Sequence, residues 1–137
     1  MTNRAVINDI LNRSYAARLN NDPEGSIDDF AKTGVFSMFG AEGGHQTAVN
    51  SKIDGGLAKA LKDMTAVWRW REVAERARLI DGNRASVHYD LTADFTPTGE
   101  TVVTEIIDLW RFEDGAVAEL REFVDTALLQ RLEQAAG

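Results

Sequence analysis

The sequence predicts an α+β domain in which helices cover one face of an antiparallel sheet. Two helical patterns, a short strand and a third helical pattern precede four strands, and a short helix follows them. The four late strands are separated only by tight turns, which favours antiparallel neighbours. With 137 residues, the chain is long enough to bury a core, and we expect a single domain over residues 1–137.

Composition argues against several classes of protein. The formal net charge is −7 and the 15 Lys and Arg residues are scattered, so we expect no nucleic-acid partner. The chain has no cysteine, which excludes disulfides, a thiol nucleophile and a thiolate metal site. The first ten residues lack the apolar core of a signal peptide, and no apolar run reaches the length of a membrane span. We therefore expect a cytoplasmic protein with no membrane partner.

Residues 3–20 predict an amphipathic helix, because apolar side chains recur at every fourth position. This row consists of Ile7, Leu11, Tyr15 and Leu19. Tyr15 is either a core residue or a catalytic donor. A second, short helix is expected over residues 23–31, with Asp22 as its N-cap and Pro23 at its first position.

A short strand is expected at residues 35–39, because the segment is rich in aromatic and β-branched side chains. The glycine-rich residues 40–44 fit neither a phosphate loop nor a dinucleotide motif, so we expect a loop over a pocket mouth. A third helix is expected from His45 to about Met64, weakened in its middle by Gly55 and Gly56. His45 is expected on the surface.

The next two strands show clear alternation. Residues 65–80 place Trp68 and Trp70 in one row, and the alternation slips near residues 72–74, which indicates a bulge. Residues 84–95 have two distinct faces. The apolar row is Val87, Tyr89, Leu91, Ala93 and Phe95, and the polar row is Ser86, His88, Asp90, Thr92 and Asp94. The polar row is either solvated or lines a wet cavity.

Residues 101–126 are expected to form a hairpin around an Asp114-Gly115 turn, followed by a helix over residues 127–134. Asp108 interrupts an apolar row of the first strand, and Glu122 shares a row of the second strand with Ala118 and Leu120, while Val117 is assigned to the opposite row. Acids in apolar rows indicate a partly dry cavity, where carboxyl pKa values rise. The alternative is that each acid is an edge residue or belongs to a structural ion pair.

The segments LNRSYAARLNNDPEGSIDDFAKTGVF and IIDLWRFEDGAVAELREFVD resemble the nuclear-transport-factor-2-like superfamily. That group includes SnoaL-like polyketide cyclases, ketosteroid isomerases and limonene epoxide hydrolases. The resemblance implies a cone-shaped, curved antiparallel sheet with helices packed on its concave face. It also implies a homodimer. Members of one fold carry different chemistries, so function depends on the site.

Compared with the ketosteroid isomerases, Tyr15 lies where their oxyanion-hole tyrosine sits, and Asp108 lies where their protonated aspartic acid sits. Met38 falls near the position of their general base, and methionine cannot abstract a proton. Compared with the cyclases and epoxide hydrolases, Glu122 lies at their acid/base carboxylate. His88 and Asp90 are the nearest match to the Arg and Asp of the epoxide hydrolases, and could position a water opposite Glu122.

These observations predict a small enzyme that needs no cofactor and no metal. It would transfer protons on an apolar or aromatic small molecule, as in isomerisation, cyclisation or epoxide hydration. The predicted catalytic residues are Tyr15, His88, Asp90, Asp108 and Glu122, and the predicted binding wall is Phe36, Met38, Trp68, Trp70 and Trp110.

Two alternatives remain open at this point: a binding module or dimeric carrier without chemistry, and a purely structural homodimer with a filled cone. The dimer is expected to cover an apolar convex face. Its expected members are Val87, Tyr89, Leu91, Phe95, Ile107, Leu109 and Phe123.

Overall fold

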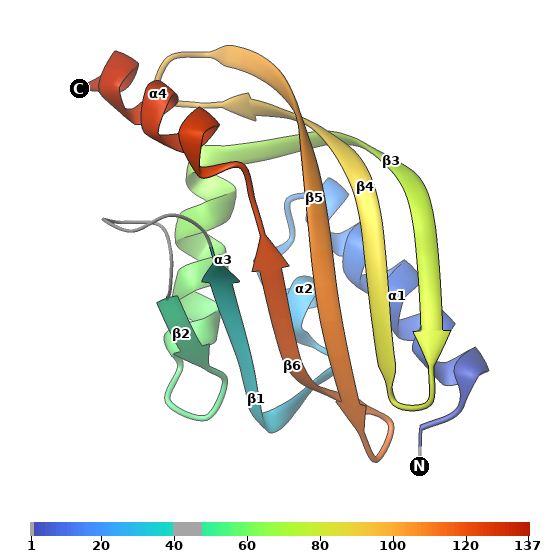
Figure 1. Cartoon of the computed structure of the whole chain (residues 1–137). Coiled ribbons are helices and arrows are strands. Elements are labelled where there is room, and N and C mark those ends of the chain that lie inside the picture. Colours follow the sequence, from blue (N-terminus) through green and yellow to red (C-terminus); the bar gives the residue numbers. More distant parts are fainter. Residues whose placement is uncertain (1, 40–47) are drawn as a thin grey trace.

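A computed structural model describes residues 2–39 and 48–137 of the chain. The elements in order are α1 (Arg4–Leu19), α2 (Pro23–Ile27), β1 (Phe30–Phe39), β2 (Ala48–Ser51), α3 (Gly56–Val67), β3 (Trp68–Asp81), β4 (Arg84–Phe95), β5 (Glu100–Glu113), β6 (Ala116–Phe123) and α4 (Thr126–Ala136). Within the described residues the strands form one six-stranded sheet in the order β2-β1-β6-β5-β4-β3 (Figure 1).

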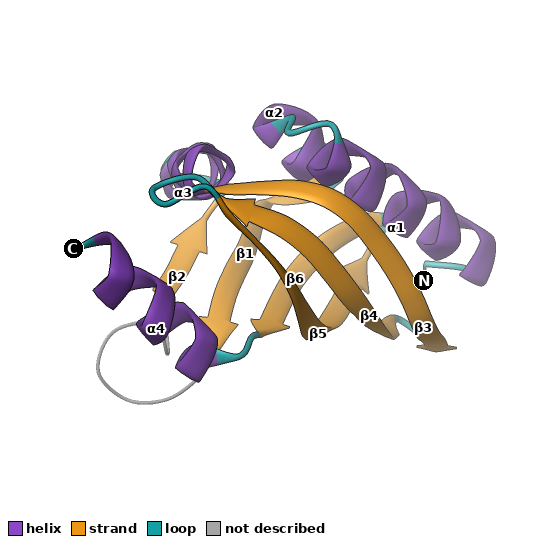
Figure 2. Ribbon diagram, turned by 90° about the horizontal axis from the view of Figure 1, so that it is seen from above, coloured by secondary structure: helices purple, strands orange, loops and turns teal. Residues whose placement is uncertain are grey.

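The sheet is strongly curved, and α1, α2 and α3 lie together on its concave side (Figure 2). The strands from β3 to β6 pair antiparallel with their neighbours, as expected. In contrast, β1 pairs parallel with β6, so the sheet is mixed. Parallel pairing needs a long connection, and the segments from β2 to β5 between these two strands supply it.

Irregular pairing accompanies the curvature. The β3–β4 register shifts between Trp70 and Glu72, which confirms the predicted slip, and shifts again between Glu75 and Ala77. The β5–β6 register shifts between Arg111 and Phe112. Val117 is buried together with Ala118, so the assignment of these two residues to opposite rows is wrong at this shift.

The first helix forms as predicted. The Asn3 side chain accepts a hydrogen bond from the Val6 amide and so caps α1. Ile7, Leu11 and Tyr15 are buried on its inner face. The apolar row read from the sequence is therefore the face that packs on the sheet.

Two predicted helices are shorter in the structure. The second ends at Ile27, because the carbonyl of Asp29 accepts a hydrogen bond from Val117 and Phe30 already pairs with β6. A Cβ atom at Gly34 would lie 2.8 Å from the Val117 carbonyl oxygen, so only glycine permits this approach. Sheet pairing has replaced the last turn of the predicted helix.

The third predicted helix is divided. Residues 48–51 form β2 beside β1, and α3 begins only at Gly56, after Gly55 adopts a positive φ of 78°. The glycine-rich loop at residues 40–44 and the surface position expected for His45 lie outside the described residues.

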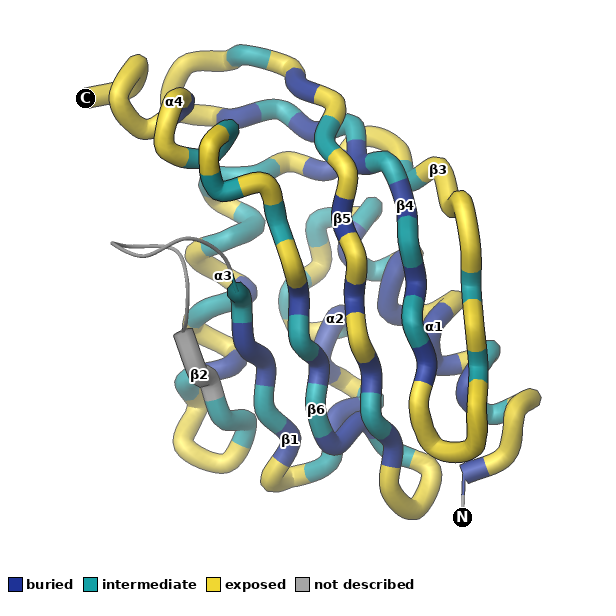
Figure 3. The backbone as a smooth tube through the Cα atoms, viewed as in Figure 1, coloured by how far each residue is buried: buried dark blue, intermediate teal, exposed yellow. Residues whose placement is uncertain are grey.

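The main core fills the space between the concave face and the helices, and burial alternates along the strands (Figure 3). Val87, Tyr89, Leu91 and Phe95 belong to this buried side, so their predicted place on the convex face is wrong. The reason is that alternation separates two rows of side chains without showing which row meets the helices. On the convex face Val103, Ile107, Leu109 and Phe123 are exposed.

A second, smaller core holds the C-terminal helix. Leu132 of α4 is fully buried against Phe95 and Val102, near the turn that joins β4 to β5. Asp125 caps α4 by accepting a hydrogen bond from the Leu128 amide. Among the described residues, no helix combines the length and apolar character that crossing a membrane requires.

Candidate functional site

The two predicted acids lie side by side on the concave face. Asp108 of β5 is the direct cross-strand partner of Glu122 of β6. Their exposed fractions are 1% and 2%. Directly opposed residues on one face have Cβ atoms about 5 Å apart, which brings the two carboxyl groups into contact range.

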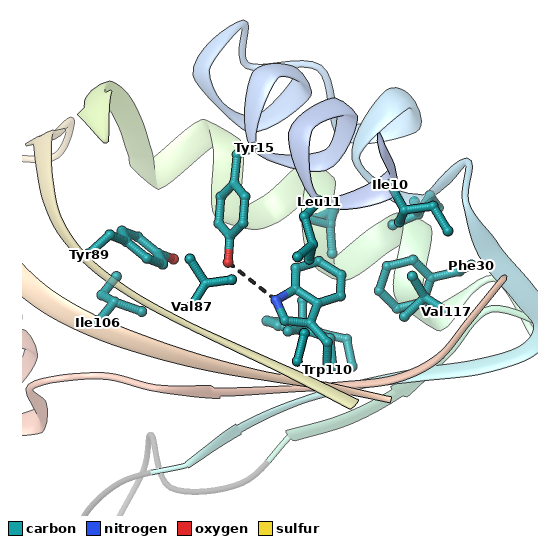
Figure 4. Close-up of a cluster of buried hydrophobic side chains, with 14 of the residues drawn as sticks. Ile10, Leu11, Tyr15, Phe30, Val87, Tyr89, Ile106, Trp110 and Val117 are labelled. Carbon is teal, nitrogen blue, oxygen red and sulfur yellow. Dashed lines mark hydrogen bonds between the residues drawn. The ribbon is translucent and has the colours of Figure 1, made fainter. Parts of the chain in front are cut away.

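Asp108 is held by a network of aromatic side chains. The Tyr15 hydroxyl donates a hydrogen bond of 2.6 Å to Oδ2 of Asp108, and the Tyr89 hydroxyl donates one of 2.9 Å to the same oxygen. The indole nitrogen of Trp110 donates to the Tyr15 oxygen at 3.3 Å (Figure 4). The Tyr15 ring packs edge-on against Tyr89 with centroids 5.2 Å apart. The network joins α1, β4 and β5.

Burial raises the pKa of Asp108 well above its ordinary value, and the nearby Glu122 raises it further. Hydrogen bonds from Tyr15 and Tyr89 lower this pKa without outweighing burial. Burial, followed by Asp108, raises the pKa values of both tyrosines. Asp108 therefore keeps its proton to a higher pH than an ordinary aspartic acid does.

The unpartnered oxygen atoms of the two acids indicate that the pair holds one proton. Within the described residues, Oδ1 of Asp108 and Oε2 of Glu122 are buried without a hydrogen-bond partner. Two ionised carboxylates offer only acceptors, whereas a protonated Asp108 adds one donor to the pair. Two close acids in a dry site share one proton for the same reason.

Arg18 faces the acids from α1, and the sequence analysis did not identify it. Its guanidinium nitrogen lies 3.9 Å from Oε2 of Glu122 and its guanidinium carbon lies 4.0 Å from the centre of the Trp70 ring. Arg18 follows Tyr15 by three positions, which places it on the buried face of the helix. This spacing is the feature of the sequence that could have identified Arg18. Tyr89 was also missed as a polar partner, because it stands in an apolar row.

Two hollows border this cluster. The larger, of about 50 Å³, is bordered by Glu122, Arg18 and three residues of the predicted wall. Those three are Met38, Trp68 and Trp70. The smaller, of about 10 Å³, lies beside Asp108 and Tyr15 and is bordered by the other two, Phe36 and Trp110. The structure therefore divides the predicted wall between the two hollows.

His88 and Asp90 lie on the other side of the sheet. His88 Nε2 is 2.6 Å from Oε2 of Glu105, and Asp90 accepts a hydrogen bond of 3.0 Å from Arg76. The expectation that they face Glu122 is wrong, because the neighbouring Val87 and Tyr89 occupy the concave side and successive side chains alternate. In the described part of the chain, no group of three or more His, Asp or Glu residues is placed to hold a metal ion.

Comparison with known proteins concerns nearly the whole chain. Residues 11–120 match the SnoaL-like domain family. Curated protein sequences give no match. The fold is similar to that of a proposed isomerase from Bacillus subtilis, with a TM-score of 0.81 and 16% identity, covering 96% of this chain and 94% of that one.

Two further solved structures have the same fold. One is TerC, co-crystallised with polyporic acid, with a TM-score of 0.73 and 20% identity over 90% of this chain and 95% of that one. The other is a proposed SnoaL-like polyketide cyclase from a Jannaschia species, with a TM-score of 0.74 and 15% identity over 92% of this chain and 90% of that one. Identities this low show the fold alone.

Proposed function

The chain belongs to the SnoaL-like domain family, and from this premise we propose that it is an enzyme that transfers protons on a small apolar or aromatic molecule without a cofactor. The reaction would be an isomerisation, a cyclisation or an epoxide hydration. The carrying observation is the buried Asp108–Glu122 pair beside a hollow. A carboxyl group beside a ligand can accept a proton from it and return the proton to it.

Glu122 is the proposed acid or base, because it borders the larger hollow. Asp108 keeps the pair at a single negative charge by holding a proton, with Tyr15 and Tyr89 orienting its carboxyl group. Met38 borders the same hollow and takes no part in proton transfer. The reacting group, Glu122, is thus supplied by β6.

The walls support an apolar ligand. Trp68, Trp70 and Leu91 border the larger hollow together with Leu128 and Leu129 of α4. Such walls provide apolar contact area, while a few polar groups set orientation. TerC was co-crystallised with polyporic acid, and it shares this fold. This supports an aromatic ligand for the present chain.

A second candidate function is a binding module without chemistry. The larger hollow measures about 50 Å³. Pockets for drug-sized ligands measure about 300 Å³ or more. A larger ligand therefore has to displace α4 or wall side chains to enter, and a cone that stays this narrow would favour a structural or carrier role.

We also propose a cytoplasmic homodimer. A chain without cysteine suits a reducing compartment. The exposed Ile107, Leu109 and Phe123 on the convex face provide an apolar surface for a second copy.

The test uses β-tetralone, an aromatic ketone with acidic hydrogens next to its carbonyl. In heavy water, we expect the protein to catalyse exchange of those hydrogens, followed by nuclear magnetic resonance. Glu122→Gln should slow the exchange by about 10²-fold or more, because general base catalysis contributes about that much. Chemical shift changes should show that the ketone still binds this variant.

Glu119→Gln is the matched control, since Glu119 lies on the same strand and points away from the hollow toward Arg111. It should exchange like the unchanged protein. Binding of β-tetralone without exchange in the unchanged protein would favour the binding module. Equal loss of binding and exchange in Glu122→Gln would assign Glu122 a structural role.

A further inference from the structure

We propose that the guanidinium of Arg18 is the group that binds the oxygen atom of the ligand. This inference rests on the proposed function and assigns a further binding residue to the same site. It also moves the oxygen-binding role away from Tyr15 and Asp108, the pair that the family resemblance suggests.

The first argument is that the donors around Asp108 are already used. A tyrosine hydroxyl or an indole has one proton to donate. Tyr15 and Tyr89 both donate to Asp108, and Trp110 donates to Tyr15. The proton of Asp108 itself is needed by the pair with Glu122. No donor of this network is left for a ligand oxygen.

The size of the smaller hollow also argues against binding of the ligand oxygen by Asp108 or Tyr15. The hollow beside Asp108 and Tyr15 measures about 10 Å³. That is close to the minimum of about 10–15 Å³ that a single water molecule requires. A carbonyl group attached to an aromatic body cannot reach Asp108 without displacing core side chains.

The donors of Arg18, in contrast to those around Asp108, are not already used. Its side chain is 8% exposed, and one guanidinium nitrogen lies 3.9 Å from Glu122 Oε2. That distance is too long for a hydrogen bond, so the five N–H donors of the guanidinium have no such bond within the described structure. The guanidinium carbon lies 4.0 Å from the centre of the Trp70 ring, so Trp70 covers one face of the group. Arg18 borders the larger hollow as well as the smaller one.

The charges of Arg18 and Glu122 favour a neutral ligand. Arg18 carries one positive charge and a carboxylate at Glu122 carries one negative charge, while a protonated Asp108 adds none. A neutral ligand leaves this balance unchanged. A ligand carboxylate would place a second negative charge beside Glu122 in a dry site, which is costly.

Geometry selects the reacting atoms. Nη1 of Arg18 and Oε2 of Glu122 are 3.9 Å apart, so the two groups can contact neighbouring atoms of one ligand. A carbonyl oxygen and a hydrogen on the adjacent carbon have this relation. Glu122 takes that hydrogen as a proton, and the C–H electron pair forms the carbon–carbon double bond of an enolate. The carbonyl pair moves to oxygen, where Arg18 holds the negative charge. Return of the proton from Glu122 to carbon completes the step with no other reactant.

The test uses para-nitrophenol, which absorbs visible light when it is ionised. Its hydroxyl imitates the step, because the proton can pass to Glu122 while Arg18 holds the phenolate. At a pH below the pKa of the free phenol, we expect the unchanged protein to bind the coloured phenolate. Arg18→Met should lower the ratio of bound phenolate to bound phenol by about 10- to 100-fold, as loss of a hydrogen bond to a charged group predicts.

Two variants separate Arg18 from its rivals. Tyr15→Phe should lower the phenolate ratio by a smaller factor than Arg18→Met does, because Tyr15 acts only by orienting Asp108. Arg121→Met is the matched control, because Arg121 also lies over an aromatic ring, at 4.5 Å from Phe39, but on the other face of β6. It should behave like the unchanged protein. If Arg18→Met does not fold, Arg18→Lys tests the same point, with an intermediate ratio expected because lysine keeps the charge and loses the planar fork.

The inference is overturned if the unchanged protein binds no phenolate, or if Tyr15→Phe removes the phenolate while Arg18→Met retains it. Exchange of β-tetralone hydrogens that persists in either case leaves the proposed function standing. Phenolate binding through Arg18 without any exchange would instead support this site and contradict the proposed reaction.

Discussion

Asp108 and Glu122 are direct cross-strand partners that are both buried on the concave face of the sheet. Each would be unremarkable alone at the surface. Together and dry, they cannot both be ionised without a large electrostatic cost, so the pair favours one proton over none. The protonation of Asp108 is therefore linked to the stability of the fold as well as to the proposed chemistry.

The first prediction concerns the pH dependence of stability. A pKa that is raised on folding stabilises the native state fully below the unfolded pKa, and this contribution is lost as pH rises through the native pKa. For Asp108, the loss begins near the unfolded value of about 3.9 and continues upward. Asp108→Asn mimics the protonated acid and should remove this loss.

The unfolding free energy of the unchanged protein should thus fall relative to Asp108→Asn by at most about 1.4 kcal/mol per pH unit above that value. Urea titrations across pH measure the difference. Asp94→Asn is a control of opposite sign, since Arg71 lowers the pKa of Asp94 and its contribution is lost as pH falls. A constant difference between the unchanged protein and Asp108→Asn would refute the shared proton.

The second prediction compares two tyrosines. Tyr15→Phe removes the bond to Asp108 and also leaves the Trp110 nitrogen without its acceptor, whereas Tyr89→Phe removes one bond. We expect a loss of about 2–3 kcal/mol for Tyr15→Phe and about 1–1.5 kcal/mol for Tyr89→Phe. Urea unfolding at mildly acidic pH, where Asp108 is protonated, gives both values. A greater loss for Tyr89→Phe would contradict the network.

Local patterns accounted for much of this site. The spacing of Ile7, Leu11 and Tyr15 predicted α1, and alternation assigned Asp108 and Glu122 to apolar rows. The turn was predicted as well, and Asp114 and Gly115 adopt the positive φ values of 49° and 80° that a tight hairpin needs. The turn alone would place Asp108 opposite Arg121, and the register shift between Arg111 and Phe112 moves its partner to Glu122.

Contacts between residues far apart in the chain could not be predicted from local sequence patterns. The parallel pairing of β1 with β6 joins segments that lie far apart in the chain. The side of the sheet that faces the helices could not be read from alternation, so His88 and Asp90 were assigned to the wrong side. Arg18 was missed because its contact with Glu122 joins the first helix to the last strand.

The third prediction concerns α4, which borders the larger hollow through Leu128 and Leu129. Leu132 anchors this helix in a core separate from the main one. Leu132→Ala should destabilise the docked helix by about 2–4 kcal/mol, and amide hydrogen exchange over residues 126–136 should accelerate before the rest of the chain.

Arg131→Gln is the matched comparison on the same helix. It removes the exposed ion pair with Glu100, whose atoms are 2.9 Å apart, and exposed pairs contribute little. Its exchange pattern should stay close to that of the unchanged protein. Uniform acceleration along the whole chain in Leu132→Ala would show that α4 does not open separately.

The last prediction concerns the convex face. Ile107 and Phe123 are cross-strand partners, and their exposed fractions are 42% and 38%. Adjacent apolar side chains with this exposure favour burial against a second copy. Sedimentation should show a dimer at micromolar concentration for the unchanged protein, and Ile107→Lys should give a folded monomer, because a buried lysine charge opposes association. Ile53→Lys makes the same exchange at a side chain that is 71% exposed in the turn before α3, and it should remain dimeric. A stable monomer in the unchanged protein would show that the convex face stays open to solvent.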